Sequence, residues 1–133
     1  LESGLMIVQY SAGSALAEMH GHAAPRTSFS TSTSAGQEDH VSMGATACWN
    51  LYQSCIRLSE VLACELVIAC QALEYNKLKP APFVKSLHKL VRSISPKLTE
   101  DRSTSAELLS IAKILREGTW LSRIEAENER LIR

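Results

Sequence analysis

The sequence predicts an all-α fold, in which a long central helix of a helical bundle is followed by shorter C-terminal helices. Over about residues 43–79, apolar and small residues recur at alternating three- and four-residue steps, which is typical of a helix that packs against other helices. Pro80 and Pro82 end that helix, and Pro96 ends the next one. The recurring residues of the long helix are Leu51, Cys55, Leu58, Leu62, Leu66, Ala69 and Leu73.

The segment before the long helix divides into a helix and a loop. We expect a helix over about residues 4–19, because apolar residues recur there at helical steps. We expect an irregular loop over residues 23–42, because the hydroxyl-rich run from Thr27 to Ser34 competes for backbone hydrogen bonds. A loop of about twenty residues in a compact domain is often functional, although a flexible linker is the simpler alternative.

The C-terminal part, residues 82–133, is expected to form short helices. Apolar residues gather on one side over about residues 82–94 and again over about residues 103–117. Gly118 is well placed to end the second of these helices in the left-handed conformation. Residues 119–133 alternate Glu and Arg, which predicts a solvated terminal helix.

The long helix is most apolar over residues 61–73. This run is too short to span a membrane, which needs about 20 residues, yet its apolar surface wraps nearly all the way round and must therefore be buried on all sides. A chain of 133 residues can hardly surround a helix of roughly 50 Å. We therefore expect burial against the remainder of a larger protein, other subunits, or both. Glu65, inside the run, is expected to be a structural carboxylate paired with an arginine or a backbone group.

Composition excludes several classes of partner. The net charge is zero, so there is no electrostatic footprint for nucleic acid or for an anionic membrane surface. Aromatic residues make up only 5% of the chain, which argues against platforms for base stacking. The chain begins at Leu1, in the middle of an apolar pattern, and is therefore expected to be a piece of something longer.

The cysteines and histidines predict structure rather than chemistry. All four cysteines fall in the long helix, the closest two about 9 Å apart, so no disulfide forms within it and they are expected to be small core residues. Reduced thiols suggest a cytoplasmic setting. A metal site is not expected, because His-x-His at a helix end does not place both rings on one face. The residues involved are Cys48, Cys55, Cys64 and Cys70, and, for the metal, His20, His22, Glu38 and His40.

The stretch from Ser34 to Gly44 has the sequence Ser-Ala-Gly-Gln-Glu-Asp-His-Val-Ser-Met-Gly. It resembles the matching segment of the histidine and aromatic amino-acid ammonia-lyases, and the match continues on both sides in order and with compatible spacing. The flanking segments that resemble the family are Gly4 to Tyr10, Leu62 to Leu66, Ala69 to Leu73, Glu100 to Arg102 and Arg116 to Gly118. The whole chain, residues 1–133, is thus similar to the family's C-terminal helical segment, with 23–42 as an active-site loop.

The resemblance implies an all-helical tetramer whose prosthetic group, methylidene-imidazolone, forms from an Ala-Ser-Gly tripeptide. It implies that Glu38 meets the imidazole of L-histidine, which is converted to urocanate in histidine catabolism, with Gln37 beside it and His40 supporting it. The implied partners are the N-terminal remainder of the enzyme, further subunits and an amino-acid substrate. No Ala-Ser-Gly occurs in this chain, so we assign no catalytic residue here and expect the chain alone to be inactive.

Two departures from the family pattern keep other functions open. The loop lacks the family's usual proline before Thr-Ser, and Cys48, Trp49 and Asn50 stand where basic residues are frequent. One alternative is a phenylalanine or tyrosine ammonia-lyase, or an aminomutase, that happens to carry Glu38. An alternative of another class is a non-catalytic helical module for oligomerisation.

Overall fold

A computed structural model of the protein describes residues 3–77 and 79–128, and within these ranges it confirms the all-α prediction. The helices are α1 (Met6–His22), α2 (Gly44–Leu73), α3 (Pro82–Arg92), α4 (Ser105–Glu117) and α5 (Thr119–Asn128). Two short 3-10 turns, η1 (Arg26–Phe29) and η2 (Ser34–Gly36), lie in the loop between α1 and α2. The predicted helical positions 78 and 129–133 lie outside the described residues.

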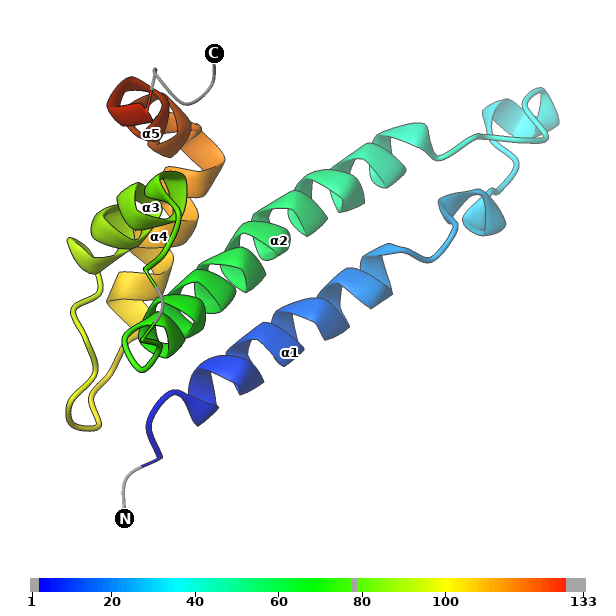
Figure 1. The fold of residues 1–133 in the computed structure, drawn as a ribbon. Coiled ribbons are helices and arrows are strands. Elements are labelled where there is room, and N and C mark those ends of the chain that lie inside the picture. The colour runs from blue at the N-terminus through cyan, green and yellow to red at the C-terminus, as the bar shows by residue number, and fades with distance from the viewer. Residues whose placement is uncertain (1–2, 78, 129–133) are drawn as a thin grey trace.

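The helices α1 and α2 lie side by side and antiparallel, and the connecting loop lies at one end of this hairpin (Figure 1). The helices α3, α4 and α5 gather beside the other half of α2, so the loop extends well away from them (Figure 1). Arg57 of α2 links the two helices of the hairpin, because its Nε lies 2.7 Å from the carboxylate of Glu18 in α1, while its Nη1 lies 2.9 Å from Glu60 on α2 itself. The fold thus presents the loop at one tip of the molecule.

The main core lies between α2 and the C-terminal helices. Ala63 of α2 and Ala112 of α4 are completely buried, and their small side chains allow the two helix backbones to approach closely. Burial raises the pKa of the Cys64 and Cys70 thiols, so both stay protonated near neutral pH. The core cluster consists of Ala63, Val67, Cys70, Val91, Ile111 and Ala112.

The buried face of α2 is not the predicted leucine seam. Small and medium residues face α1 and α4, whereas Leu51 is 66% exposed and Leu62 is 40% exposed. Sequence periodicity marks every apolar face of such a helix and does not show which of them this chain covers. This exposed apolar surface agrees with the expectation that the chain by itself is too small to bury all sides of α2. The buried residues of α2 are Ser59, Ala63, Cys64, Val67 and Cys70.

The same exposed surface corrects two expectations about single residues. Cys48 and Cys55 are exposed rather than core residues, although all four cysteines are free as predicted. Glu65 is exposed and forms no ion pair within the described ranges, so the prediction of a paired structural carboxylate is wrong for this chain. Both errors arise because these residues lie on faces of α2 that the chain leaves uncovered.

Helix ends differ from prediction mainly at α2, which ends at Leu73 rather than at residue 79. Hydrogen bonds between residues three apart, such as that from the Tyr75 N–H to the Ala72 carbonyl, form a tight turn there. Gly118 ends α4 with φ of +69°, as predicted. The last helix is less solvated than expected, because Ile124 is only 2% exposed.

A polar junction joins the end of α2 to α3 and the turn after it. Glu74 Oε1 lies 2.6 Å from Arg92 Nε, and Glu74 Oε2 lies 3.3 Å from Lys97 Nζ. Gln71 accepts a hydrogen bond from Arg92 Nη2 at 2.9 Å and one from the Leu98 N–H at 3.1 Å. These contacts hold the chain just after the end of α2 against α3 and the turn that follows α3.

Candidate functional site

The loop that contains the motif is held where it leaves α1. Arg26 donates through Nη2 to the Gly21 carbonyl at 3.3 Å, and its guanidinium lies 5.7 Å from the centre of the Phe29 ring. The Ser54 hydroxyl of α2 lies 3.4 Å from Nδ1 of His22. Contacts of this kind set the direction in which the loop leaves the hairpin.

Within the loop, Thr33 and Glu38 form a reciprocal backbone pair. The Thr33 N–H donates to the Glu38 carbonyl at 2.9 Å, and the Glu38 N–H donates to the Thr33 carbonyl at 3.3 Å. The intervening turn places Ser34, Ala35 and Gly36 in the left-handed region, with φ of 54°, 55° and 82°. For Ser34 and Ala35 this conformation costs roughly 1–2 kcal/mol each, so the turn is a strained one that the pair closes.

The side chains of this pair are joined as well. Thr33 Oγ1 donates to Glu38 Oε2 at 3.0 Å, and the Glu38 side chain is exposed. A hydroxyl that donates to a carboxylate makes a charge-assisted hydrogen bond, which is stronger than one between neutral groups. The loop thus presents an oriented hydrogen-bond acceptor at its surface.

The two predicted neighbours of Glu38 are placed differently. Gln37 donates through its backbone N–H to the Ser34 carbonyl at 3.2 Å, and its side chain is exposed. His40 is exposed too, and in the described part of the chain neither side chain hydrogen-bonds to Glu38. The side chain that hydrogen-bonds to Glu38 is that of Thr33, which sequence reasoning missed. A hydroxyl residue flanking a Ser-Ala-Gly turn is the signal that could have found it.

A second closure lies further down the loop. The Val41 N–H donates to Ser30 Oγ at 2.8 Å, so two cross-links, this one and the Thr33–Glu38 pair, tie the two sides of the loop together. Met43 then adopts a left-handed conformation, with φ of 54°, immediately before α2 begins at Gly44. The motif is therefore almost wholly non-helical and ends at the first residue of α2.

Two other kinds of feature are absent from the part of the chain that the structure describes. Across residues 3–77 and 79–128, no three His, Cys, Asp or Glu side chains gather in a way that could hold a metal ion. No helix in the same ranges is long and apolar enough to cross a membrane. The strained turn and the hydrogen-bonded carboxylate of Glu38 make the loop the candidate functional site.

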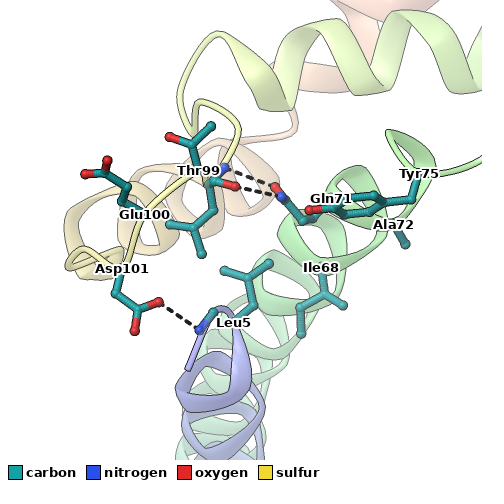
Figure 2. Close-up of a pocket in the computed structure, with 10 residues that line it drawn as sticks. Leu5, Ile68, Gln71, Ala72, Tyr75, Thr99, Glu100 and Asp101 are labelled. Carbon is teal, nitrogen blue, oxygen red and sulfur yellow. Dashed lines mark hydrogen bonds between the residues drawn. The ribbon is translucent and has the colours of Figure 1, made fainter. Parts of the chain in front are cut away.

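A separate hollow of about 420 Å³ lies at the other end of the α1–α2 hairpin (Figure 2). Two of its polar side chains already have partners: Asp101 accepts from the Ser3 and Gly4 N–H groups at 2.7 Å and 2.8 Å. Gln71 donates to the Leu98 carbonyl at 3.0 Å and accepts from the Leu98 N–H. These hydrogen bonds hold the segment before α1 and the segment before α4 in place, so their role is structural.

Comparison with known proteins gives a consistent result. A family model described as aromatic amino acid lyase matches residues 1–93. Proteins named histidine ammonia-lyase are 40% identical over 121 residues in Geobacillus sp. and 38% identical over 132 residues in Gloeobacter violaceus, covering 90% and 98% of this chain. The crystal structure of histidine ammonia-lyase from Trypanosoma cruzi superposes with a TM-score of 0.85 at 32% identity, over 96% of this chain.

The matched region is a limited part of each relative. The chain spans 24% of the Geobacillus protein, 26% of the Gloeobacter protein and 25% of the Trypanosoma cruzi chain. About three quarters of each of these relatives therefore has no counterpart in this chain.

Proposed function

The chain belongs to the aromatic amino acid lyase family, and from this premise we propose that it is part of an ammonia-lyase that converts L-histidine to urocanate. Its role in that enzyme is to supply a substrate-binding loop, residues 23–42. Similarity to proteins named histidine ammonia-lyase over nearly the whole chain supports this proposal.

The observation that carries the choice of substrate is the exposed carboxylate of Glu38, held on the strained turn by Thr33. A carboxylate accepts a hydrogen bond from an imidazole N–H and stabilises the positively charged ring. Against a phenyl ring the same carboxylate would be desolvated without a partner, which is costly. A site built in this way discriminates by leaving a polar group unpaired when the wrong substrate binds. Gln37 and His40 are proposed as neighbours of the bound ring.

The electrophile has to come from outside this chain. The family uses methylidene-imidazolone, which supplies an electrophilic carbon when present, and its precursor Ala-Ser-Gly is absent here. The described residues therefore do not form its site, and this chain's contribution is confined to binding and orienting the substrate. The partners are the N-terminal remainder of the enzyme, which carries the tripeptide, and further subunits of a tetramer.

The exposed apolar surface supports such an assembly. Leu51, Leu58 and Leu62 of α2 are each at least 40% exposed, as are Ile7 and Tyr10 of α1. Large apolar side chains exposed in this number on two neighbouring helices are consistent with contact with other protein. The free thiols support a cytoplasmic location, where disulfides are rare.

The test is Glu38→Gln in the full assembly, with urocanate formation from histidine as the measurement. Loss of the charge should lower kcat/KM by roughly 10- to 100-fold, as for a hydrogen bond to a charged group. Asp39→Asn is the matched control, because Asp39 is an adjacent exposed carboxylate with no hydrogen bond in the described ranges. The molecular mass of the assembly should be unchanged in both variants.

Each other outcome selects a different function. Unchanged histidine turnover in Glu38→Gln would refute the substrate role of Glu38. Turnover of phenylalanine or tyrosine in preference to histidine would identify the aromatic lyase or aminomutase. Purification without any polypeptide that bears Ala-Ser-Gly would favour a non-catalytic helical module.

A further inference from the structure

The side chain of Glu38 has two carboxylate oxygens in different surroundings. Oε2 accepts the hydrogen bond from Thr33 Oγ1 at 3.0 Å, whereas Oε1 accepts none in the described part of the chain. A carboxylate offers about four lone-pair sites on its two oxygens. The Thr33 contact therefore leaves Oε1 open to a donor from outside the loop, such as the N–H of an imidazole.

The position of the Thr33 hydroxyl is itself well defined. Two backbone hydrogen bonds, at 2.9 Å and 3.3 Å, hold Thr33 directly opposite Glu38. The β-branched side chain of threonine has few χ1 rotamers, so the hydroxyl is placed by the backbone with little remaining freedom. A glutamate side chain has three rotatable bonds, and it is the flexible member of this pair.

We propose that Thr33 is a positioning residue for Glu38: its hydroxyl holds the carboxylate in the rotamer that presents Oε1 to the substrate ring. The proposal rests on the proposed function, since it gives Thr33 a role only through Glu38. A binding group that is ordered before the ligand arrives does not have to be ordered on binding, and this increases affinity. Thr33 thereby acts on the affinity for imidazole compounds more than on the chemical step.

The first experiment compares Thr33→Val with Thr33→Ser in the full assembly. Valine keeps the branched shape and the backbone pair but removes the hydroxyl, whereas serine retains the donor. Thr33→Val should lower kcat/KM for histidine roughly tenfold, through KM more than kcat. The kcat/KM of Thr33→Ser should stay within about threefold of the wild-type value. A difference of this kind between the two variants depends on the hydroxyl and would not arise if both substitutions only disturbed the backbone.

A second readout follows binding without turnover. Urocanate carries the same imidazole ring, so its inhibition constant should rise in parallel with KM in Thr33→Val and recover in Thr33→Ser. Thr31→Val is the matched control, because the exposed Thr31 hydroxyl lies in the same loop and makes no hydrogen bond to the described residues. If Thr33→Val does not assemble, Thr33→Ala replaces it, again judged against Thr33→Ser.

A double-mutant cycle separates this inference from the proposed function. In a Glu38→Gln background, Thr33→Val should cost less than about twofold, because the charged carboxylate that Thr33 positions has been removed. A full tenfold cost in that background, or equal activity of the wild type and Thr33→Val, would overturn the role of Thr33 while Glu38 keeps its own. If Glu38→Gln alone is fully active, the proposed function fails, whatever the Thr33 variants do.

Discussion

Replacing Glu74 by Gln should loosen the junction between α2 and α3, where one carboxylate serves several partners. The Glu74 side chain is 17% exposed and contacts Arg92 Nε at 2.6 Å, Lys97 Nζ at 3.3 Å and His88 Nε2 at 3.5 Å. Arg92, itself 12% exposed, also donates to the Ser95 carbonyl at 3.0 Å. Removing the charge leaves a largely buried guanidinium without its anionic partner.

The magnitude follows from the Arg92 contact. Hydrogen bonds to charged groups contribute about 1.5–3 kcal/mol, and an amide oxygen retains part of that. Lys97 is 46% exposed, so solvent screens its pairing and we assign it nothing. We expect the junction to lose about 1.5 kcal/mol, which corresponds to roughly tenfold more frequent local opening.

Amide hydrogen exchange in the full assembly measures this opening directly. Two amides report on the junction: the Ser95 N–H, bonded to the Val91 carbonyl at 2.8 Å, and the Leu98 N–H, bonded to Gln71. Both should exchange about tenfold faster in Glu74→Gln. Glu65→Gln is the matched control, since Glu65 is a carboxylate of α2 that forms no ion pair within the described residues. Equal exchange in Glu74→Gln and the wild type would refute the reasoning.

The same junction predicts a pH dependence. Burial raises the pKa of Glu74, but hydrogen bonds and charges from Lys97 and Arg92 outweigh burial and hold it below the ordinary value of 4.5. A lowered folded-state pKa means that the stabilisation is fully present above about pH 4.5 and is lost as pH falls through the lower folded value. The difference in exchange between the wild type and Glu74→Gln should therefore shrink as the pH is taken below 4.5. A difference that grows on acidification would contradict this sign.

Two further predictions concern helix ends. Asp101→Asn removes the charge that accepts hydrogen bonds from the Ser3 and Gly4 N–H groups just before α1, so these two amides should lose about 1 kcal/mol of protection against hydrogen exchange; unchanged exchange there would count against a stabilising role for this contact. Gly118→Ala places a side chain at φ of +69° with open space around it, so the cost is that of the backbone alone, about 1 kcal/mol. It should appear as a lower melting temperature, with a smaller loss in Gly118→Asn; equal losses in the two variants would point to another cause.

Much of the helical framework could be predicted from local signals. Gly118 was expected to end α4 and does so in the left-handed conformation. Pro82 begins α3, and no helix crosses residues 23–42 except the short turns. These features depend on the backbone preferences of single residues, which act wherever the residue stands.

Other features depend on which surfaces meet, and these were not predictable. The leucine steps of α2 indicated a buried seam, yet Leu51 and Leu62 are exposed while Ala63 and Val67 form the core. The hydrogen bond between Thr33 and Glu38 was missed because it depends on a turn with three consecutive left-handed residues. Local propensity does not predict left-handed conformations for Ser or Ala, so the only sequence signal was the hydroxyl residue that flanks the Ser-Ala-Gly turn.

Residue identity and local periodicity were sufficient to predict the family, the all-helical class and the presence of Glu38 in a non-helical loop. The buried face of α2, the residue at which α2 ends and the hydroxyl that bonds to Glu38 became known from the three-dimensional fold. Each of those depends on contacts between segments: α2 with α4, Glu74 with Arg92, and Thr33 with Glu38. Such contacts depend on packing and on the closure of turns, and the periodicity of a single helix does not predict them.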